Sequence, residues 1–569
     1  MAIVWEDHRV LLIFFSVLFA GIRVNSLPYD YSASIECLAE PLKPQYGGGI
    51  LVNPEFQHGL RGWAGFGGVI ASSNGGNSFM VVRSGGRPTK RLYLHDDRIY
   101  TFSAWVQISE GSARVGAVFN TADGDMHAGA TIAEAGCWSM IKGGLSVNKS
   151  GPAELYFQSK NASVEIWIDS ISLQPFTREE WRSHQEESTQ KARKRSVRFQ
   201  AVDSQGKSLP GANLSIELNR ASFPLGCAIN RNILQNTGYQ QWFTARKFTV
   251  TVFEDELKWY STERNQGQED YSVSDALFAF AKRHGLAVRG HNVFWDDAKY
   301  QMGWINNLSP DQLRAATDKR INSVMSRYAG QVNSWDVVNE NLHFNFYESK
   351  LGAGFSTDAY QKAHRLDGRT TMFLNEYNTL EYSGDRAVTP SEYIKKVNQI
   401  KSQGPTGIGL EGHFVSVNLA YIRSAIDQLA ATGLPIWITE LDVANSINQA
   451  QALEQILREA STHPAVHGVV IWAAWSPGGC YKMCLTDNNF RNLPTGDVVD
   501  KLLREWGALR LQGTTDSDGY FEAVLPHGDY QVTIFDPSKN SSFAHAMKVE
   551  ADTKEEKSVL HLEVHASEA

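Results

Sequence analysis

Eight short apolar runs recur between residues 223 and 508, and each of them ends in polar residues. Stretches with helical spacing separate the runs, so strand and helix alternate along this part of the chain. Eight such units predict a closed parallel (β/α)8 barrel, the TIM barrel, rather than an open sheet. The runs are 223–229, 248–256, 286–295, 333–340, 370–378, 407–414, 435–442 and 468–475.

Two of the intervening helices carry readable start signals. Residues 309–312 (SPDQ) and 389–392 (TPSE) each place a hydroxyl residue before proline, with Gln or Glu three residues on. This pattern is a capping box with proline at the first helical position. Apolar residues at 394, 397 and 400 follow the second box at helical spacing. Both stretches are therefore predicted to be helices packed on the barrel.

Residues 45–176 show a different pattern, in which short alternating strands are separated by glycine-rich turns. Two packed antiparallel sheets, a β-sandwich of the jelly-roll kind, are expected to precede the barrel. Residues 177–196 (TREEWRSHQEESTQKARKRS) are polar and dense in charge. They are expected to form a linker or an exposed helix.

The barrel is flanked by two β-rich segments, 197–222 and 509–569. Both contain strand-turn-strand patterns with Gly and Asp at the turns. Placed end to end, the segments resemble the transthyretin-like fold of carboxypeptidase regulatory domains. One hypothesis is a single small β-sandwich with the barrel inserted into it, and the alternative is two unrelated β appendages.

The first 26 residues contain one apolar run, 10–22, with Arg9 before it. Thirteen residues are short for a membrane span, which needs about 20, and typical of the core of a signal peptide. We therefore expect residues 1–26 to be a signal peptide and the protein to be secreted to the cell exterior or wall, with a signal anchor as the alternative.

Cysteines and glycosylation sequons agree with secretion. Five sequons occur, at Asn148, Asn161, Asn213, Asn307 and Asn540. Among five cysteines, Cys480 and Cys484 could close a small loop, Cys37 and Cys137 could pair, and Cys227 would remain. The sequence alone leaves this connectivity open.

The charge balance narrows the range of partners. Lys plus Arg number 54 and Asp plus Glu 62, a net charge of −8, which argues against nucleic acid or an anionic membrane as partner. Aromatic residues make up 11% of the chain, which suits stacking on neutral sugars and equally suits large aromatic cores.

Catalytic groups of a parallel barrel project from the carboxyl ends of its strands. Glu340 ends the fourth run and Glu440 lies near the end of the seventh, nearly across the barrel mouth. Two facing glutamates can cleave a glycosidic bond, because one protonates the leaving oxygen and the other attacks the anomeric carbon or activates water. Burial and the like charge would keep the acid protonated.

The motifs VVNE, WITELD, GHNVFW, FLNEYN and GLEGHF resemble, in order along the barrel, glycoside hydrolase family 10, the endo-β-1,4-xylanases. CYKMCLTDNNF and GCWSMIKGG resemble its plant members. The resemblance implies endo-hydrolysis of xylan with retention of configuration, Glu340 as acid/base, Glu440 as nucleophile, and no catalytic cofactor or metal. The substrate-binding residues that it implies are Asn339, His291, Lys258, His413, Trp295, Trp472, Glu254 and Asp255.

The chain departs from the pattern of this family at several positions. It has Glu254-Asp255 where Glu-Asn is usual, Glu376 where Asp is usual, and Glu411 where Gln is usual. Asp296 follows Trp295 where His is frequent, and a second Trp after the eighth strand is replaced by the Cys480–Cys484 region. These changes put the −2 sugar contact, the substrate preference and the pH optimum in doubt without removing a catalytic group.

The segment 45–176 resembles carbohydrate-binding module family 22 through NPEFQHGLRGW, YTFSAWVQ and EIWIDSISL. That resemblance makes Arg83, Tyr156 and Gln158 candidates for ligand contacts of the module. Glu55 and Asp169 are candidates for the structural calcium that some members hold.

Three rival functions remain open at this stage. The first is a xylan endotransglycosylase on the same site, since water and sugar can both accept a glycosyl-enzyme intermediate. The second is a non-catalytic, xylan-binding wall protein, and the third is a barrel hydrolase for another β-glycan. The protein is expected to be a monomer.

Overall fold

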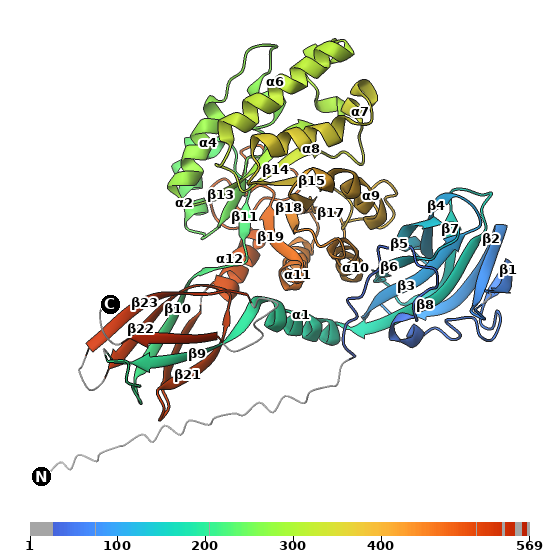
Figure 1. The fold of residues 1–569 in the computed structure, drawn as a ribbon, viewed down its shortest axis with the longest axis horizontal. Coiled ribbons are helices and arrows are strands. Elements are labelled where there is room, and N and C mark those ends of the chain that lie inside the picture. Colours follow the sequence, from blue (N-terminus) through green and yellow to red (C-terminus); the bar gives the residue numbers. More distant parts are fainter. Residues whose placement is uncertain are drawn as a thin grey trace, which may run out of the picture.

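The computed structural model describes residues 27–73, 75–203, 205–507, 509–536, 541–551 and 560–565. They form an N-terminal β-sandwich, a central barrel and a second β unit (Figure 1). The expected signal peptide, 1–26, and the sequon at Asn540 lie outside the described residues. Within the described part, no helix is long and apolar enough to cross a membrane.

The central unit is the predicted (β/α)8 barrel, and this prediction is confirmed. Parallel pairs join each strand to the next, and β19 returns to β11 to close the ring. Every predicted run contributes one strand, because apolar side chains face both the barrel interior and the surrounding helices. The strands are β11 (Leu225–Cys227), β12 (Val250–Val252), β13 (Ala287–Trp295), β14 (Ser334–Asn339), β15 (Thr371–Glu376), β16 (Thr406–Leu410) with its extension β17 (His413–Phe414), β18 (Ile436–Val443) and β19 (Val466–Ile471).

The two helix-start signals have different outcomes. Ser309 forms a complete capping box with Gln312, as predicted. Thr389 accepts the backbone N–H of Glu392, but Glu392 reaches Arg114 of the β-sandwich at 2.6 Å. The barrel helices are α2 (Thr237–Thr244), α3 (Trp259–Thr262), α4 (Ser272–Arg283), α5 (Gly303–Asn306), α6 (Pro310–Tyr328), α7 (Phe346–Leu351), α8 (Phe355–Leu366), α9 (Pro390–Ile400), α10 (Leu419–Ala430), α11 (Gln449–Thr462) and α12 (Pro494–Gly507).

The N-terminal unit consists of two antiparallel sheets that share the long strand β2. One end of β2 pairs with β1 and β8, and the other end pairs with β7. Its core is apolar, and a disulfide joins Cys37 to Cys137. The strands are β1 (Ala64–Ser72), β2 (Ser78–Leu94), β3 (Arg98–Ile108), β4 (Ser112–Thr121), β5 (Gly124–Glu134), β6 (Ser139–Leu145), β7 (Gly151–Ser159) and β8 (Ile166–Thr177).

The segment 177–196, expected to be a linker or an exposed helix, forms a helix that packs on the barrel, followed by the start of a strand. Helix α1 (Arg178–Arg193) begins at a capping box formed by Thr177 and Glu180. Trp181 is buried and donates to Glu459 of α11 at 2.9 Å, and Ser188 donates to a carbonyl of the same helix. Most charged residues of α1 therefore lie on its outer face, while the inner face, with Arg193, packs on the barrel.

The two β-rich flanks form one unit, with the barrel inserted between β10 and β20. Strands from both flanks alternate in two sheets, β20-β10-β22-β23 and β21-β9-β24, around a shared core. We refer to it as the terminal sandwich. Its strands are β9 (Lys194–Val202), β10 (Asn213–Ala221), β20 (Arg510–Thr514), β21 (Tyr520–Pro526), β22 (Gly528–Asp536), β23 (Ser541–Val549) and β24 (Leu560–His565).

The N-terminal sandwich docks on α10 through the glycines that follow Lys142. Gln428 and Ser424 donate to the carbonyls of Lys142 and Gly143, at 2.9 and 2.8 Å. The buried ammonium of Lys142 lies 2.8 Å from Asp427, so the two opposite charges compensate each other inside the protein. A Cβ at Gly144 would meet the Cβ of Ala420 at 2.4 Å, so only glycine allows this approach.

Replacing Gly144 with leucine is expected to force the sandwich and the barrel apart. Overpacking of this kind costs about 1–3 kcal/mol. Limited proteolysis at the junction and the thermal unfolding curve would report the loss. Gly151→Leu is the matched control, because a Cβ there meets nothing within 4 Å. Equal stability of the two variants would contradict the proposed role of the glycine.

Candidate active site

Glu340 and Glu440 lie at the carboxyl end of the barrel, and both are buried. Glu340 directly follows β14, and Glu440 is part of β18. Glu340 has a φ of 58°, which is rare for a residue with a side chain, and its N–H donates to the carbonyl of Asn375 at 3.0 Å. Such a conformation persists only where the surrounding structure fixes it, and it occurs most often at functional sites.

Positively charged and amide groups surround Glu440. Asn375 donates to its Oε1 at 2.8 Å, and Nδ1 of His291 lies 3.7 Å from the same oxygen. Nε2 of His413 lies 3.5 Å from Oε2. Asp336 and Asp442 hold the two imidazoles by their Nδ1 atoms, at 2.9 and 2.8 Å. The carboxylate of Glu440 is thus held in one orientation from several sides.

The two glutamates have pKa values shifted in opposite directions. Burial raises the pKa of Glu340, and the charges of Glu376 and Glu440 raise it further. Burial also acts to raise the pKa of Glu440, but the charge of His291 and the hydrogen bond from His413 lower it below its ordinary value. Near neutral pH the site therefore holds one protonated and one ionised glutamate, the pair that acid-assisted nucleophilic displacement at a sugar requires.

Asn375, which the sequence analysis did not select, connects several groups of the site. Its Nδ2 donates to Asn339 at 2.9 Å as well as to Glu440, and its Oδ1 accepts from Thr439 at 2.5 Å. Its position at the end of β15 is the sequence signal that identifies it. By occupying Oδ1 of Asn339, Asn375 leaves the amide nitrogen of Asn339 as the group that can meet a substrate hydroxyl.

One wall of the site is built from Lys258 and two tryptophans. The ammonium of Lys258 lies 4.5 Å from the ring centre of Trp295 and 5.5 Å from that of Trp472. Trp295 stacks on Tyr300, with 3.8 Å between ring centres. Trp472 belongs to an apolar layer in the barrel interior and closes the floor under His291. All three predicted residues therefore lie together beside the glutamates.

Glu254 and Asp255 follow β12 on the same side as Lys258. Asp255 accepts from Lys258 at 3.1 Å and from the hydroxyl of Tyr260 at 2.5 Å. Burial raises the pKa of Glu254 to about 7, and Asn230 donates to it at 2.8 Å. The carboxylate of Asp255, which stands where the family usually has an amide, is thus paired with the ammonium of Lys258 and the hydroxyl of Tyr260.

Glu376 and Asp296, two of the carboxyl groups that depart from the family pattern, are held by hydrogen bonds within the protein. Glu376 is fully buried, lies 2.6 Å from His343 and accepts the N–H of Leu342. Asp296 is also fully buried and accepts from Asn341 and from the N–H of Tyr347. These side chains brace the loops that follow β14 and β13.

Glu411 is expected to work as a neutral acid. Burial raises its pKa well above the ordinary value, and the charges of Glu440 and Glu340 raise it further. Its Oε2 lies 3.4 Å from Nε2 of His413, whose own pKa rises, against the effect of burial, through hydrogen bonds to Asp442, Glu411 and Glu440. A protonated carboxyl and the usual amide both offer one donor and one acceptor here.

Glu411→Gln is therefore expected to keep activity within about tenfold and to leave the alkaline limb of the pH profile in place. The measurement is kcat/KM against pH, compared with the unchanged chain. If Glu411 were ionised in the working enzyme, removing its charge would lower the pKa of Glu340. The alkaline limb would then move to lower pH by about one unit or more, which would contradict the prediction.

Tyr481 is a second site residue that the sequence analysis missed. It lies in the loop closed by the Cys480–Cys484 disulfide, and its ring is 69% exposed. Its edge contacts the ring of His413, with 5.1 Å between ring centres. The loop that replaces the usual second tryptophan thus supplies an aromatic surface at the edge of the site.

The candidate ligand residues of the N-terminal sandwich are not gathered in one place. Tyr156 and Gln158 share one face of β7, whereas Arg83 lies on β2 beyond the part that pairs with β7. Tyr156 is buried, its hydroxyl donates to Asp125, and the guanidinium of Arg87 lies 3.8 Å from its ring centre. Tyr156 therefore offers no free ring face to a sugar.

Glu55 and Asp169 both have partners within the protein, and calcium binding by them stays a prediction. The ammonium of Lys43 lies 2.5 Å from Glu55, and the amide of Asn77 donates to Asp169 at 2.8 Å. The Lys43 ammonium competes with a cation at Glu55, and Ca²⁺ requires six to eight oxygen ligands. Among the described residues, the side chains close enough to share a metal are the disulfide pair Cys37 and Cys137 with Glu134, and Glu411, His413 and Glu440 of the site above.

Comparisons with known proteins identify the family of this chain. Residues 215–493 match the model of glycosyl hydrolase family 10. The chain is 39% identical to "Endo-1,4-beta-xylanase 5-like" of Arabidopsis thaliana over 91% of each chain, and 38% identical to "Endo-1,4-beta-xylanase 5" of the same plant over 95% of each. Xylanase 10B of Thermotoga petrophila, solved with xylobiose, is 22% identical at a TM-score of 0.45, covering 50% of this chain and 94% of its own. The chain is a glycoside hydrolase and belongs to glycosyl hydrolase family 10.

Proposed function

We propose that the protein is an endo-acting hydrolase of β-1,4-xylosidic bonds in cell-wall xylan. In this mechanism Glu440 attacks the anomeric carbon while Glu340 protonates the leaving oxygen, which gives a covalent glycosyl-enzyme. Glu340 then takes a proton from water, which releases the sugar with retained configuration. The observation that carries the proposal is the opposite shift of the two pKa values in one buried site.

Substrate contacts follow from the same geometry. Asn339 and His291 flank the nucleophile and are proposed to bind hydroxyls of the sugar under attack, with Trp472 beneath it. Lys258, Asp255 and Glu254 would extend this contact toward the next sugar. Xylan as substrate is supported by the plant relatives. They match this chain along nearly its whole length and are named endo-1,4-beta-xylanases.

Secretion to the cell wall belongs to the same proposal. The sequons at Asn148, Asn161, Asn213 and Asn307 all lie at exposed residues, and two disulfides form among the five cysteines while Cys227 stays buried and free. Oxidised cysteine pairs and exposed sequons suit the secretory pathway. Binding of xylan by the N-terminal sandwich and the monomeric state stay predictions.

The test is product analysis with soluble xylan, in which proton NMR follows the anomeric signal of the first product. The proposal expects short xylo-oligosaccharides that appear first as β-anomers. A first product in the α-form would contradict retention. If products form only when a xylo-oligosaccharide acceptor is added, the enzyme is a transglycosylase; if xylan is bound but unchanged, the protein is a non-catalytic binder.

Tyr481 is proposed to stack on a sugar unit of the bound substrate at the edge of the active site. Tyr481→Ala is then expected to raise KM for xylohexaose about threefold to tenfold with little change in kcat, since an aromatic contact is worth about 0.5–1.5 kcal/mol. Tyr93→Ala, an exposed tyrosine on the N-terminal sandwich, is the control. A fall in kcat at unchanged KM would show that Tyr481 acts on the chemical step instead.

A further inference from the structure

A groove of about 710 Å³ lies between the barrel and the terminal sandwich, and we call it the lower groove. It is lined by residues that directly precede barrel strands, including Phe223, Thr249 and Leu286, and by the end of β10 and helix α12. Glu340 and Glu440 stand at the opposite, carboxyl end of the strands. The lower groove is therefore separate from the active site, and its volume is that of an ordinary ligand pocket.

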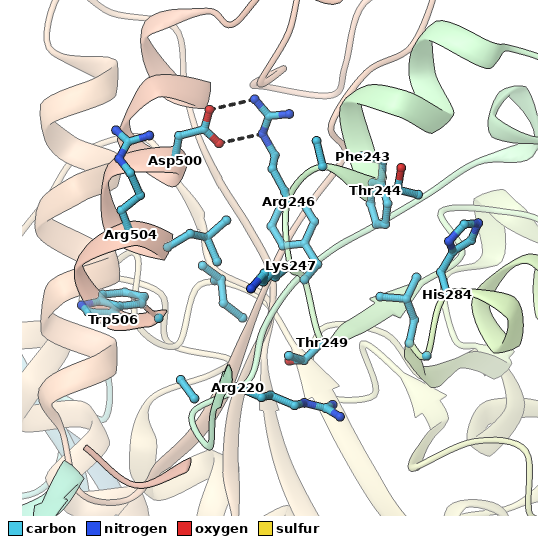
Figure 2. A pocket seen from close by; sticks show the side chains of 18 of the residues that line it. Arg220, Phe243, Thr244, Arg246, Lys247, Thr249, His284, Asp500, Arg504 and Trp506 are labelled. Carbon is cyan, nitrogen blue, oxygen red and sulfur yellow. Dashed lines mark hydrogen bonds and ion pairs between the residues drawn. The ribbon is translucent and has the colours of Figure 1, made fainter. Parts of the chain in front are cut away.

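Basic side chains surround the lower groove (Figure 2). Arg220, Lys247 and Arg504 are exposed, and none of them pairs with a carboxylate of the described residues. The single carboxylate in the lining, Asp500, is already bound by Arg246 at 2.7 and 2.8 Å. In a chain of net charge −8, this is a local excess of unpaired positive charge.

The basic residues come from three different segments. Arg220 is the second-last residue of β10, Lys247 lies in the loop before β12, and Arg504 lies on α12. Figure 2 shows Arg504 and Arg220 at different ends of the opening. A single phosphate could meet few of them, whereas a chain with a charge on successive units could meet all three. The arrangement thus fits an extended polyanion.

The same groove also contains aromatic side chains. Trp506 and Phe223 are partly buried and meet edge to face, with 6.1 Å between ring centres. Aromatic rings contact the apolar faces of sugar units, while arginine binds carboxylates through paired hydrogen bonds. A chain of uronic acids offers both features, with alternating apolar faces and carboxylates.

We propose that the lower groove binds a uronate-bearing polysaccharide chain of the plant cell wall, which would hold the enzyme in place while the other end of the barrel cuts. This inference rests on the proposed wall location of the enzyme. Polygalacturonate carries a uronate on every unit and fits this arrangement best, whereas glucuronoxylan carries uronates only on branches, and the experiment below separates the two.

The test is affinity electrophoresis of the secreted chain, in a Glu440→Gln background that leaves the polymers intact. Gels contain polygalacturonate, glucuronoxylan or neutral arabinoxylan. The groove variant carries Arg220→Gln, Lys247→Gln and Arg504→Gln. The control variant removes the same charge at three exposed residues elsewhere, Lys149→Gln, Arg182→Gln and Lys207→Gln.

The groove variant is expected to bind at least one uronate polymer about tenfold or more weakly than the control, with arabinoxylan binding unchanged. Loss on polygalacturonate identifies pectic chains as the ligand, and loss confined to glucuronoxylan identifies the branches of the substrate. Equal loss in both variants, or no uronate binding by the parent, would overturn the proposal. The proposed function is tested separately. For this test the groove variant is made with Glu440 unchanged, and its hydrolysis of arabinoxylan is measured.

Discussion

Glu440→Ala is expected to lower kcat/KM on xylan by at least about 10⁴-fold, because no other described group can take its place as nucleophile. Glu440 is ionised, is held by Asn375 and faces the histidines His291 and His413. Alanine removes the attacking oxygen and leaves those histidines in place. The measurement is initial rate on xylohexaose, followed by chromatography of the products.

Rescue by a small anion distinguishes loss of the nucleophile from loss of structure. Azide can enter the space left by the carboxylate and attack the anomeric carbon from the same face, so the product formed with the Ala variant should be the α-glycosyl azide. Glu505→Ala, which removes a surface glutamate, is the control and should keep full activity. A β-azide product, or more than about one hundredth of normal activity without azide, would refute Glu440 as nucleophile.

Glu340→Ala is expected to lower kcat/KM on xylan by about 10²–10⁴-fold, the usual contribution of a positioned general acid. The loss should be much smaller on an aryl xylobioside, because an activated phenol leaves without being protonated. Deglycosylation would then be slow, since no base activates water. A burst of phenol followed by a slow steady rate is the expected time course.

With azide, Glu340→Ala is expected to give the stereochemical outcome opposite to that of Glu440→Ala. Azide needs no general base, so it should speed the second step and yield the β-glycosyl azide, with configuration retained. The alkaline limb of the pH profile should also disappear, because the raised pKa of Glu340 sets it: activity falls as pH rises through that value and the acid is lost. An equal loss of activity on xylan and on the aryl substrate would contradict the acid role.

The pattern of apolar runs and polar run ends along the chain determined the barrel and the position of its catalytic end. Each predicted run became a strand, because residues buried on both faces of a parallel sheet must be apolar along a continuous stretch. Polar residues at the ends of those runs then had to meet at one face of a closed barrel. For this reason Glu340 and Glu440 could be selected from sequence, whereas His291 and Lys258 were implied by the resemblance to the family.

The arrangement of the flanking segments depended on contacts between residues far apart in the chain. Helix α1 looked like a linker, because charge density hid an inner face on which Trp181 and Ser188 bind α11. The usual capping partner Glu392 instead pairs with Arg114, a residue 278 positions away. Local patterns cannot reveal such partners, because the competing contact comes from another unit.

The protonation states of the site were likewise decided by the tertiary structure. The sequence determined that a carboxyl group, Glu411, stands where Gln is usual, and this change put the pH optimum in doubt. Burial between Glu340 and Glu440 raises the pKa of Glu411, which makes the group a neutral donor. The sequence by itself fixes which groups are present at the barrel mouth, whereas burial and the neighbours supplied by other strands decide which of them carry charge.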